Sequence, residues 1–413
     1  MPPTDSFLVG EKIAQAVGLL EHFDLDLWLT FVYETSLVRD PALELICPFD
    51  LTWHSALMVH RSGESVAIVG RYDAANLERL NAFSRVLSYD QSVRPALVDQ
   101  LRTWRPRTVA LNFSRSDPAS SGLTYGLKLV LDDILTEAGV LPDQSVSAEA
   151  FLGSLRGRKT PHEVECLRAA VASTESLIDE LGPHVRVGRS ERQLAGILHA
   201  RMRSLGLQPS WGWETDPVIN TGPESAIGHA GPSDWVVAPG HLVHIDFGVR
   251  RDGFCADLQR MWYVLRPDEI QPPNIVIETW ETVRRALLAG AEALRPGMSG
   301  WEVDQAARST IVAGGLPEYK HAFGHHLGRA THDGATILGP RWERYGTTPE
   351  GIVEAGNVFA IELGAEVPGH GCVCLEEDVR VTDSGIEWLS TPQTQLWIVP
   401  GAVASGSSTV SAR

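Results

Sequence analysis

The sequence predicts a protein of two domains, an α/β domain over residues 1–152 and an α+β domain over residues 153–402. The chain has 413 residues, which is too many for one ordinary hydrophobic core. In the first part, strand-like and helix-like segments alternate, as they do in α/β domains. In the second part, the order helix, helix, hairpin occurs twice, which indicates a duplicated fold with a pseudo-twofold axis. Residues 403–413 are small and polar, and they predict a disordered tail.

The elements of the N-terminal domain follow from hydrophobic periodicity. Residues 6–22 place apolar side chains at helical spacing, which predicts an amphipathic helix. Short runs rich in β-branched and aromatic residues then alternate with helical segments. Strands are expected at Leu27–Tyr33, Ala56–His60, Val66–Gly70 and Thr108–Asn112, and helices at Asn76–Phe83 and Pro95–Trp104.

The C-terminal domain is expected to begin close to a basic segment that ends in Thr160 and Pro161. Thr160 can cap a helix, and proline suits the first helical turn. Ser190 and Ser299 are candidate N-caps of the second helix in each predicted pair. The first helix of each pair is expected over residues 161–182 and 275–294.

Composition restricts the classes of function. The net charge of −17 argues against a nucleic-acid partner, because phosphates attract basic surfaces. The five cysteines are odd in number and scattered, which is a poor disulfide framework and indicates a reducing compartment. No apolar run approaches membrane-spanning length, and the N-terminus does not have the pattern of a signal peptide. We therefore expect a cytoplasmic protein with no membrane partner.

The first predicted hairpin brings two acidic side chains together. Asp252-Gly253 is a turn dipeptide between two β-rich runs. If the hairpin folds about Arg251 and Asp252, Asp246 lies directly opposite Asp257, with Cβ atoms about 5 Å apart. Like charges at such positions are destabilising unless something neutralises them.

The second predicted hairpin repeats this arrangement. Folding about Gly369 places Glu362 opposite Glu376. Four carboxylates near a pseudo-twofold axis would repel one another strongly, and divalent cations with hard oxygen ligands would remove that repulsion. The alternative is that each pair is separately salt-bridged or solvated at an exposed edge.

A histidine-rich segment lies between the two predicted hairpins in the sequence. Residues 321–333 hold four histidines and two glycines. We take His325 as the candidate metal ligand and His332 as the candidate catalytic residue. The alternative for a single Gly-His step is an ordinary loop.

These residues closely resemble the motifs of the pita-bread metallopeptidases, a group that includes methionine aminopeptidase, aminopeptidase P and prolidase. All five ligand positions of that pattern are present in order. The resemblance covers roughly residues 155–400 and, more loosely, the N-terminal domain of the prolidase and aminopeptidase P branch. The matching runs are Ile245-Asp246-Phe247-Gly248, Ala256-Asp257-Leu258-Gln259-Arg260, Gly324-His325-His326-Leu327-Gly328 with His332-Asp333, Ile361-Glu362-Leu363-Gly364 and Leu375-Glu376-Glu377-Asp378-Val379.

The resemblance implies an α/β N-terminal domain followed by a pita-bread catalytic domain that holds two divalent metal ions. Manganese is expected first, with cobalt or zinc as alternatives, because the ligand types suit several metals. Asp257 and Glu376 are expected to bridge the metals, while Asp246, His325 and Glu362 complete the ligand set.

The implied reaction is hydrolysis of a peptide by a hydroxide bound to both metals. Glu362 is expected to shuttle the proton, and His332 and His229 to steady the substrate and the tetrahedral intermediate. His229 ends the run Gly222-Pro223-Glu224-Ser225-Ala226-Ile227-Gly228-His229, which is similar to a substrate-facing segment of the group.

The histidine segment is more similar to prolidases, which cleave Xaa-Pro dipeptides, than to aminopeptidase P. A dipeptidase must bind the C-terminal carboxylate of its substrate, which a guanidinium can grip with two hydrogen bonds. Arg341 and Arg344 stand where prolidases carry such an arginine; each is alternatively a surface residue. Cys374 stands where the group usually has arginine, which puts the fine specificity in doubt. Trp211 and Trp213 either wall a proline pocket or pack a loop.

Other functions on the same fold stay open at this point. Aminopeptidase P, which acts on Xaa-Pro-Xaa peptides, is the nearest alternative, and a non-peptidase hydrolase or lyase that depends on metal is another. Creatinase-like enzymes and the binding modules of histone chaperones lose metal ligands that this chain keeps. A homodimer is implied, in which the loop near Asp40-Pro41 and Pro48-Phe49-Asp50 either closes over the neighbouring active site or is an ordinary surface loop.

Overall fold

The computed structural model describes residues 3–225, 228 and 230–401. The chain forms two compact units. The first unit comprises Met1–Glu163, Asp333–Ile337 and Arg341–Gly356, and the second comprises Val164–His332, Leu338–Pro340 and Asn357–Arg413. The first continuous stretch of the first unit therefore ends at Glu163. The domain boundary predicted after residue 152 stays a prediction. The predicted disorder of residues 403–413 lies outside the described residues.

The first unit is built on a six-stranded mixed sheet with the order β4-β3-β2-β1-β5-β6. The strand β1 pairs antiparallel with β2 and parallel with β5. The strands are β1 (Leu27–Val32), β2 (Ser55–His60), β3 (Ser65–Gly70), β4 (Arg85–Tyr89), β5 (Val109–Leu111) and β6 (Ser145–Ser147). The helices are α1 (Pro3–His22), α2 (Arg71–Leu80), α3 (Arg94–Trp104), α4 (Tyr125–Ala138) and α5 (Glu149–Gly157).

Each face of this sheet is covered by helices. Alternate residues of a strand point to opposite faces, so Trp28 packs in one core with α1, α2 and α5. Leu27 and Leu29 pack in a second core with α3 and α4. The unit is therefore a three-layer α/β domain, as the alternation of elements predicted. The sequence analysis did not identify β4, β6, α4 or α5.

The second unit contains a curled sheet in the order β13-β14-β15-β12-β9-β8, with β16 and β17 paired to β15 and β12. A separate three-stranded sheet has the order β11-β10-β7. The strands are β7 (Gln208–Pro209), β8 (Val218–Thr221), β9 (Leu242–Phe247), β10 (Val249–Arg251), β11 (Phe254–Cys255), β12 (Leu258–Val264), β13 (Gly324–His326), β14 (Val358–Val367), β15 (Gly371–Thr382), β16 (Gly385–Trp388) and β17 (Trp397–Val399).

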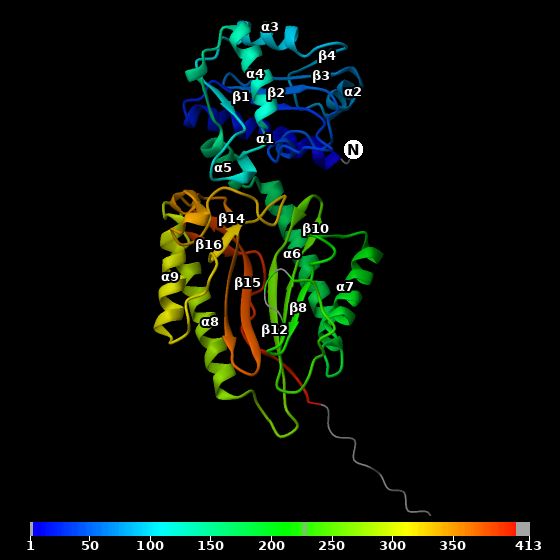
Figure 1. The fold of residues 1–413 in the computed structure, drawn as a ribbon, viewed down its shortest axis with the longest axis vertical. Coiled ribbons are helices and arrows are strands. Elements are labelled where there is room, and N and C mark those ends of the chain that lie inside the picture. Colours follow the sequence, from blue (N-terminus) through cyan, green and yellow to red (C-terminus); the bar gives the residue numbers. More distant parts are fainter. Residues whose placement is uncertain (1–2, 226–227, 229, 402–413) are drawn as a thin grey trace, which may run out of the picture. The chain divides into compact units, whose positions relative to one another are not determined.

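Two helix pairs cover the large sheet, which is the repeat that the sequence predicted. The helices are α6 (Pro161–Leu181), α7 (Glu191–Leu205), α8 (Asn274–Ala293) and α9 (Gly300–Ala313). Figure 1 shows α8 and α9 to one side of the strands and α6 and α7 to the other. The predicted N-caps are confirmed: the Ser190 hydroxyl accepts from the Gln193 amide, and Ser299 is the N-cap of α9, where its backbone amide donates to the Glu302 carboxylate. The Thr160 hydroxyl likewise accepts from the Glu163 amide.

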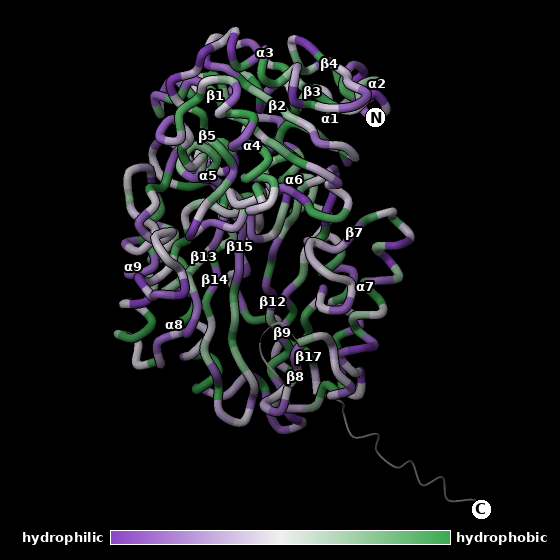
Figure 2. The backbone as a smooth tube through the Cα atoms, turned by 45° about the horizontal axis from the view of Figure 1, so that its top comes forward, coloured by the Kyte–Doolittle hydropathy of each residue, from purple (hydrophilic) through white to green (hydrophobic). Residues whose placement is uncertain are grey.

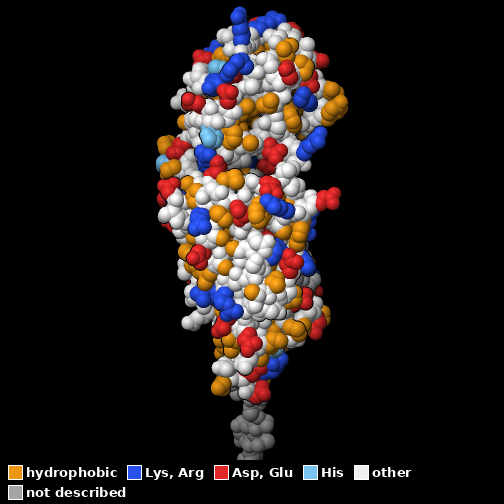
Figure 3. Space-filling view, turned by 90° about the vertical axis from the view of Figure 1, so that its left-hand side faces the viewer, with side chains coloured by type: hydrophobic (Ala, Val, Ile, Leu, Met, Phe, Trp, Pro, Cys, Tyr) orange, Lys and Arg blue, Asp and Glu red, His pale blue; other side chains and the backbone are white. Residues whose placement is uncertain are grey.

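Surface charge is mixed. On the face shown in Figure 3, acidic and basic side chains are interspersed, although the chain carries an excess of acids. Among the described residues, every helix is too short or too polar to cross a membrane.

Candidate metal centre

The hairpin of β14 and β15 has the predicted register. Gly369 adopts a left-handed backbone with φ of 77° in the turn, and Glu362 pairs directly with Glu376. The prediction that folding about Gly369 would oppose these two carboxylates is confirmed. Figure 2 shows the two strands side by side.

The hairpin that leads from β9 to β12 does not have the predicted register. Its turn residues are Asp252 and Gly253, with φ of 52° and 83°, so the turn lies one residue later than predicted. This is the left-handed pair of conformations that an Asp-Gly turn favours. As a result Asp246 pairs with Gln259, and Asp257 comes two residues earlier on the partner strand. Because the shift is two residues, the Asp257 side chain stays on the same face of the sheet.

Strand order places the acidic residues of both hairpins in one row. The strand β12 pairs with β15, and Gln259 lies opposite Glu376. Together with the two hairpin registers, this aligns Glu362, Glu376, Gln259 and Asp246 across four neighbouring strands. The predicted convergence of the two hairpins is therefore present, with a glutamine in the position where Asp257 was expected.

His325 completes the cluster from β13, which pairs with β14. The Nε2 atom of His325 lies 3.8 Å from Asp257 Oδ2 and 3.8 Å from Glu376 Oε1. One ligand atom from each of these three residues lies within 4.8 Å of the others. The centre thus brings together His325, Asp257 and Glu376, with Asp246 and Glu362 in the adjoining row.

Without a cation, burial and close spacing disfavour the charged forms of the carboxylates of the centre. Burial, followed by the nearby Glu362 carboxylate, raises the pKa of Asp246 to about 7. Burial and neighbouring carboxylates also raise the pKa values of Asp257 and Glu376 well above their ordinary range. Burial lowers the pKa of His325, so its imidazole is neutral and able to ligate a metal.

Two oxygen atoms test whether the centre fits a metal. In the part of the chain that the structure describes, Asp246 Oδ1 and Asp257 Oδ1 are buried and have no hydrogen-bond partner. Buried polar atoms normally have partners, so such atoms need an explanation. Several carboxylate oxygens and one imidazole are ligands that suit a divalent ion such as manganese, cobalt or zinc. The residues present therefore fit the expected metal ions.

A cavity of about 360 Å³ opens onto this centre. His332 stands exposed at the cavity, and its ring meets the His325 ring edge to face with centroids 4.4 Å apart. Trp211 also lines the cavity, whereas Trp213 packs against His199 and under Arg203. The remaining lining residues are Gly212, Thr215, Val218, Asp246, Asp257, His325, Thr331, Glu362 and Glu376.

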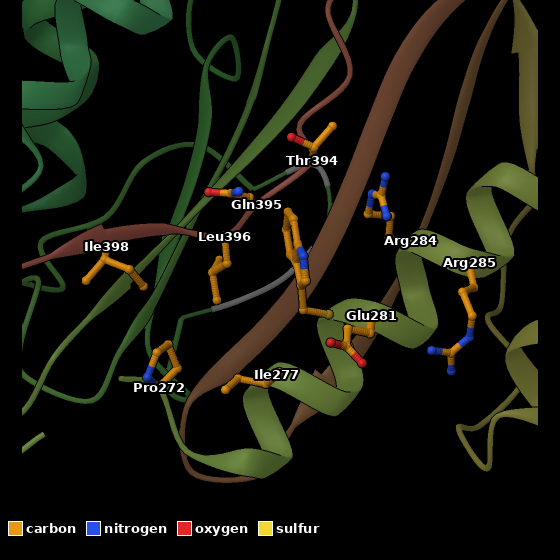
Figure 4. A pocket seen from close by; sticks show the side chains of 10 residues that line it. Pro272, Ile277, Glu281, Arg284, Arg285, Thr394, Gln395, Leu396 and Ile398 are labelled. Atoms are coloured by element: carbon orange, nitrogen blue, oxygen red, sulfur yellow. The ribbon is translucent and has the colours of Figure 1, made fainter. Parts of the chain in front are cut away.

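A second hollow is larger but has different chemistry. It measures about 460 Å³ and lies between α8 and the C-terminal segment of the second unit. Figure 4 shows apolar side chains such as Ile277 and Leu396 around it, with Glu281, Arg284 and Arg285 on α8. Its lining combines one carboxylate with two guanidiniums, so it offers no set of metal ligands.

Sequence analysis missed several polar residues that surround the ligands. Gln259 donates through Nε2 to both Glu362 and Glu376, at 2.9 Å each. Arg260 forms a buried ion pair with Glu377, and Asp378 accepts from the Asp257 amide. All of these residues lie in the matched runs, so their place beside predicted ligand positions was the available clue.

Three further predicted site residues lie either outside the described residues or in the other compact unit. His229 lies outside the described residues. Arg341 and Arg344 belong to the first compact unit, where Arg341 pairs with Glu350 at 2.6 Å. The guanidinium of Arg344 lies over the rings of Trp342 and Tyr345. Their roles as substrate ligands stay predictions.

The comparison with known proteins decides the family. Residues 165–383 match the model of metallopeptidase family M24. The chain belongs to metallopeptidase family M24. Divalent metal chemistry at the centre is therefore expected of this M24 protein, in agreement with its ligand set.

Curated M24 relatives and solved structures agree with this assignment. The chain is 28% identical over 280 residues to the uncharacterized peptidase YqhT of Bacillus subtilis, covering 68% of this chain and 73% of that one. It is 29% identical over 265 residues to an Xaa-Pro dipeptidase of Lactobacillus helveticus, covering 63% of this chain and 68% of that one.

Two solved structures share the fold of the M24 chain. An Xaa-Pro dipeptidase from Bacillus anthracis has a TM-score of 0.73 at 22% identity, with coverage of 95% of this chain and 100% of that chain. An X-Pro aminopeptidase from Thermotoga maritima has a TM-score of 0.70 at 21% identity, with coverage of 94% and 99%. At such identities the likeness shows the fold alone, and it confirms the predicted α/β domain and pita-bread domain.

Proposed function

We propose that this M24 protein is a dipeptidase that hydrolyses Xaa-Pro dipeptides. The observation that carries the proposal is the single row of Glu362, Glu376 and Asp246 beside His325, all of which line one cavity. A relative that bears the name Xaa-Pro dipeptidase supports the substrate class. The prolidase-like histidine segment supports it independently.

The proposed metal centre has two divalent ions. Asp246, Asp257, His325, Glu362 and Glu376 would hold them, with Asp257 and Glu376 shared between the two. Such a pair of ions lowers the pKa of a bound water and polarises the scissile carbonyl. Manganese is the first candidate, with cobalt and zinc as alternatives, because the oxygen and imidazole donors accept all three.

The protein side chains divide the remaining tasks. Glu362 is half-buried and lines the cavity, and one of its oxygens is held by Gln259. Its other oxygen can accept a proton and pass it to the departing amine. His332 is exposed at the cavity and can donate a hydrogen bond to the oxygen on which charge develops. His229 is proposed to orient the substrate.

The experiment that tests the substrate class compares Xaa-Pro dipeptides with Xaa-Pro-Xaa tripeptides. We expect a higher kcat/KM for dipeptides, because a longer peptide places a neutral amide where the carboxylate should sit and leaves a cationic partner unpaired. A higher kcat/KM for tripeptides would make the protein an aminopeptidase P, which is the alternative function. If neither class is cleaved while metal is bound, the remaining alternative is a non-peptidase hydrolase or lyase.

Arg341 and Arg344 are the proposed cationic partners of that carboxylate. Arg341→Ala should raise KM for dipeptides by about 10-fold or more and leave tripeptide cleavage unchanged, since a charge-assisted pair contributes about 1.5–3 kcal/mol. Exposed Arg201, which pairs with Glu180 on the second unit, gives a matched control in Arg201→Ala. Equal effects of Arg341→Ala on both substrates would show that Arg341 does not bind the C-terminal carboxylate of the dipeptide.

A homodimer in the cytoplasm is also proposed. We expect sedimentation velocity at micromolar concentration to give the mass of two chains. A single-chain mass would exclude the version in which the loop near Asp40 and Pro48 closes over a neighbouring active site.

A further inference from the structure

Gln259 occupies a distinctive place in the metal centre. In the row across β14, β15, β12 and β9, it is the one uncharged member, between Glu376 and Asp246. Its side chain is 6% exposed and its Nε2 atom lies 2.9 Å from Glu362 Oε2 and 2.9 Å from Glu376 Oε2. A single carboxamide thus contacts two carboxylates that are both expected metal ligands.

The geometry matches the hydrogen-bonding capacity of the carboxamide. A primary amide has two N–H donors, and ionised carboxylates only accept. Each N–H of Gln259 can therefore hold one glutamate. Glu376 is held through Oε2, while its Oε1 is the atom that lies 3.8 Å from His325 Nε2. The amide thus fixes the carboxylate and leaves the oxygen that faces the histidine available.

The amide oxygen of Gln259 contacts His244. The Nε2 atom of His244 lies 2.9 Å from Gln259 Oε1, and its Nδ1 atom lies 3.0 Å from Asn220 Oδ1. A neutral imidazole carries one N–H, so it donates to one of these two oxygens. Rotating the Gln259 amide by half a turn would direct its oxygen at two carboxylates, which only accept hydrogen bonds, so the two carboxylates oppose that rotation.

The support continues away from the centre. Asn220 Nδ2 donates to Ser225 Oγ at 3.2 Å, and Ser225 donates to Glu191 at 2.5 Å. Glu191 also accepts from Thr221 and Ser233, and it is buried on α7. The His244 ring is therefore anchored by buried side chains and backbone amides rather than by solvent.

We propose that Gln259 is a positioning residue that aims Glu362 and Glu376 at the metal ions through its two N–H donors. The inference rests on the proposed metal centre. Partners that orient metal ligands typically change metal affinity by about 10–100-fold when they are replaced. Gln259 also donates to two like charges at once, so it limits their repulsion before metal binds.

The test measures Mn²⁺ binding to the metal-free, full-length protein by titration calorimetry. Gln259→Met keeps the length of the side chain but removes both donors, and we expect Mn²⁺ to bind about 10–100-fold more weakly. Gln393→Met is the matched control: Gln393 is 5% exposed, and its side chain bonds to the Met261 backbone and the Gln395 carbonyl, neither of which is a proposed ligand. The control should bind Mn²⁺ as tightly as the wild type.

Two further measurements separate positioning from loss of fold. The visible absorption of bound Co²⁺ should change in Gln259→Met and not in Gln393→Met, because only the former alters the ligand arrangement. If Gln259→Met does not fold, Gln259→Asn retains the amide with a shorter reach and should also weaken binding.

The outcomes distinguish this inference from the metal centre itself. A wild-type protein that binds no Mn²⁺, Co²⁺ or Zn²⁺ would overturn the centre. A wild-type protein that binds metal no more tightly than folded Gln259→Met or Gln259→Asn would overturn the role of Gln259 alone. An equal loss in Gln393→Met would also overturn it, because the effect would then be general destabilisation.

Discussion

Replacing Asp257 with alanine is expected to abolish metal uptake and peptide hydrolysis together. Asp257 is buried, and its Oδ2 atom lies 3.8 Å from His325 Nε2. Because Asp257 is proposed to be shared by both ions, its loss removes a ligand from each. In the wild type, a metal concentration of about 100 times Kd should add about 2.7 kcal/mol to the free energy of unfolding. In Asp257→Ala this stabilisation should fall close to zero, and activity should fall below detection.

Metal analysis and thermal unfolding with and without Mn²⁺ provide the measurement. Asp179→Ala is the control, because Asp179 is an exposed carboxylate on α6. It should keep both the metal and the metal-dependent rise in Tm. The metal-free Asp257→Ala protein should be at least as stable as the metal-free wild type, since one of several mutually repelling buried carboxylates is gone. An active Asp257→Ala protein with full metal content would defeat the assignment.

The second large effect is expected at His332, where alanine should lower kcat while metal content stays near normal. His332 contacts the His325 ring edge to face but is not among the proposed ligands. A side chain that moves a proton or stabilises developing charge typically contributes about 10²–10⁴-fold to the rate. We therefore expect kcat to fall by about 100-fold or more, with KM changed much less.

The matched control for His332 is another histidine of the same segment. His321 bonds to the Ala322 carbonyl and does not line the cavity. His321→Ala should keep kcat within a few-fold of the wild type. Steady-state kinetics on an Xaa-Pro dipeptide, with metal content measured on the same samples, decide the question. An unchanged kcat in His332→Ala would remove this residue from the mechanism.

The sequence by itself determined the elements that local rules control. Helix starts were predictable at Ser190 and Ser299, because serine is a favoured N-cap residue and both serines begin a helix in the structure. The register of the second hairpin was predictable, because the turn needs a residue with positive φ and Gly369 is a glycine that adopts this conformation readily. The motifs also predicted the five metal-ligand positions, which stay predictions, and the family match spans the residues concerned.

Only the tertiary structure decided how the two hairpins meet. The turn at Asp252-Gly253 moved Asp246 out of register with Asp257, an effect of a single residue in the turn. The pairing of β12 with β15 joins segments more than 100 residues apart, and no local pattern records which residues face each other there. For this reason the contacts of Gln259 with Glu362 and Glu376, and of His244 with Gln259, became visible only in the folded chain.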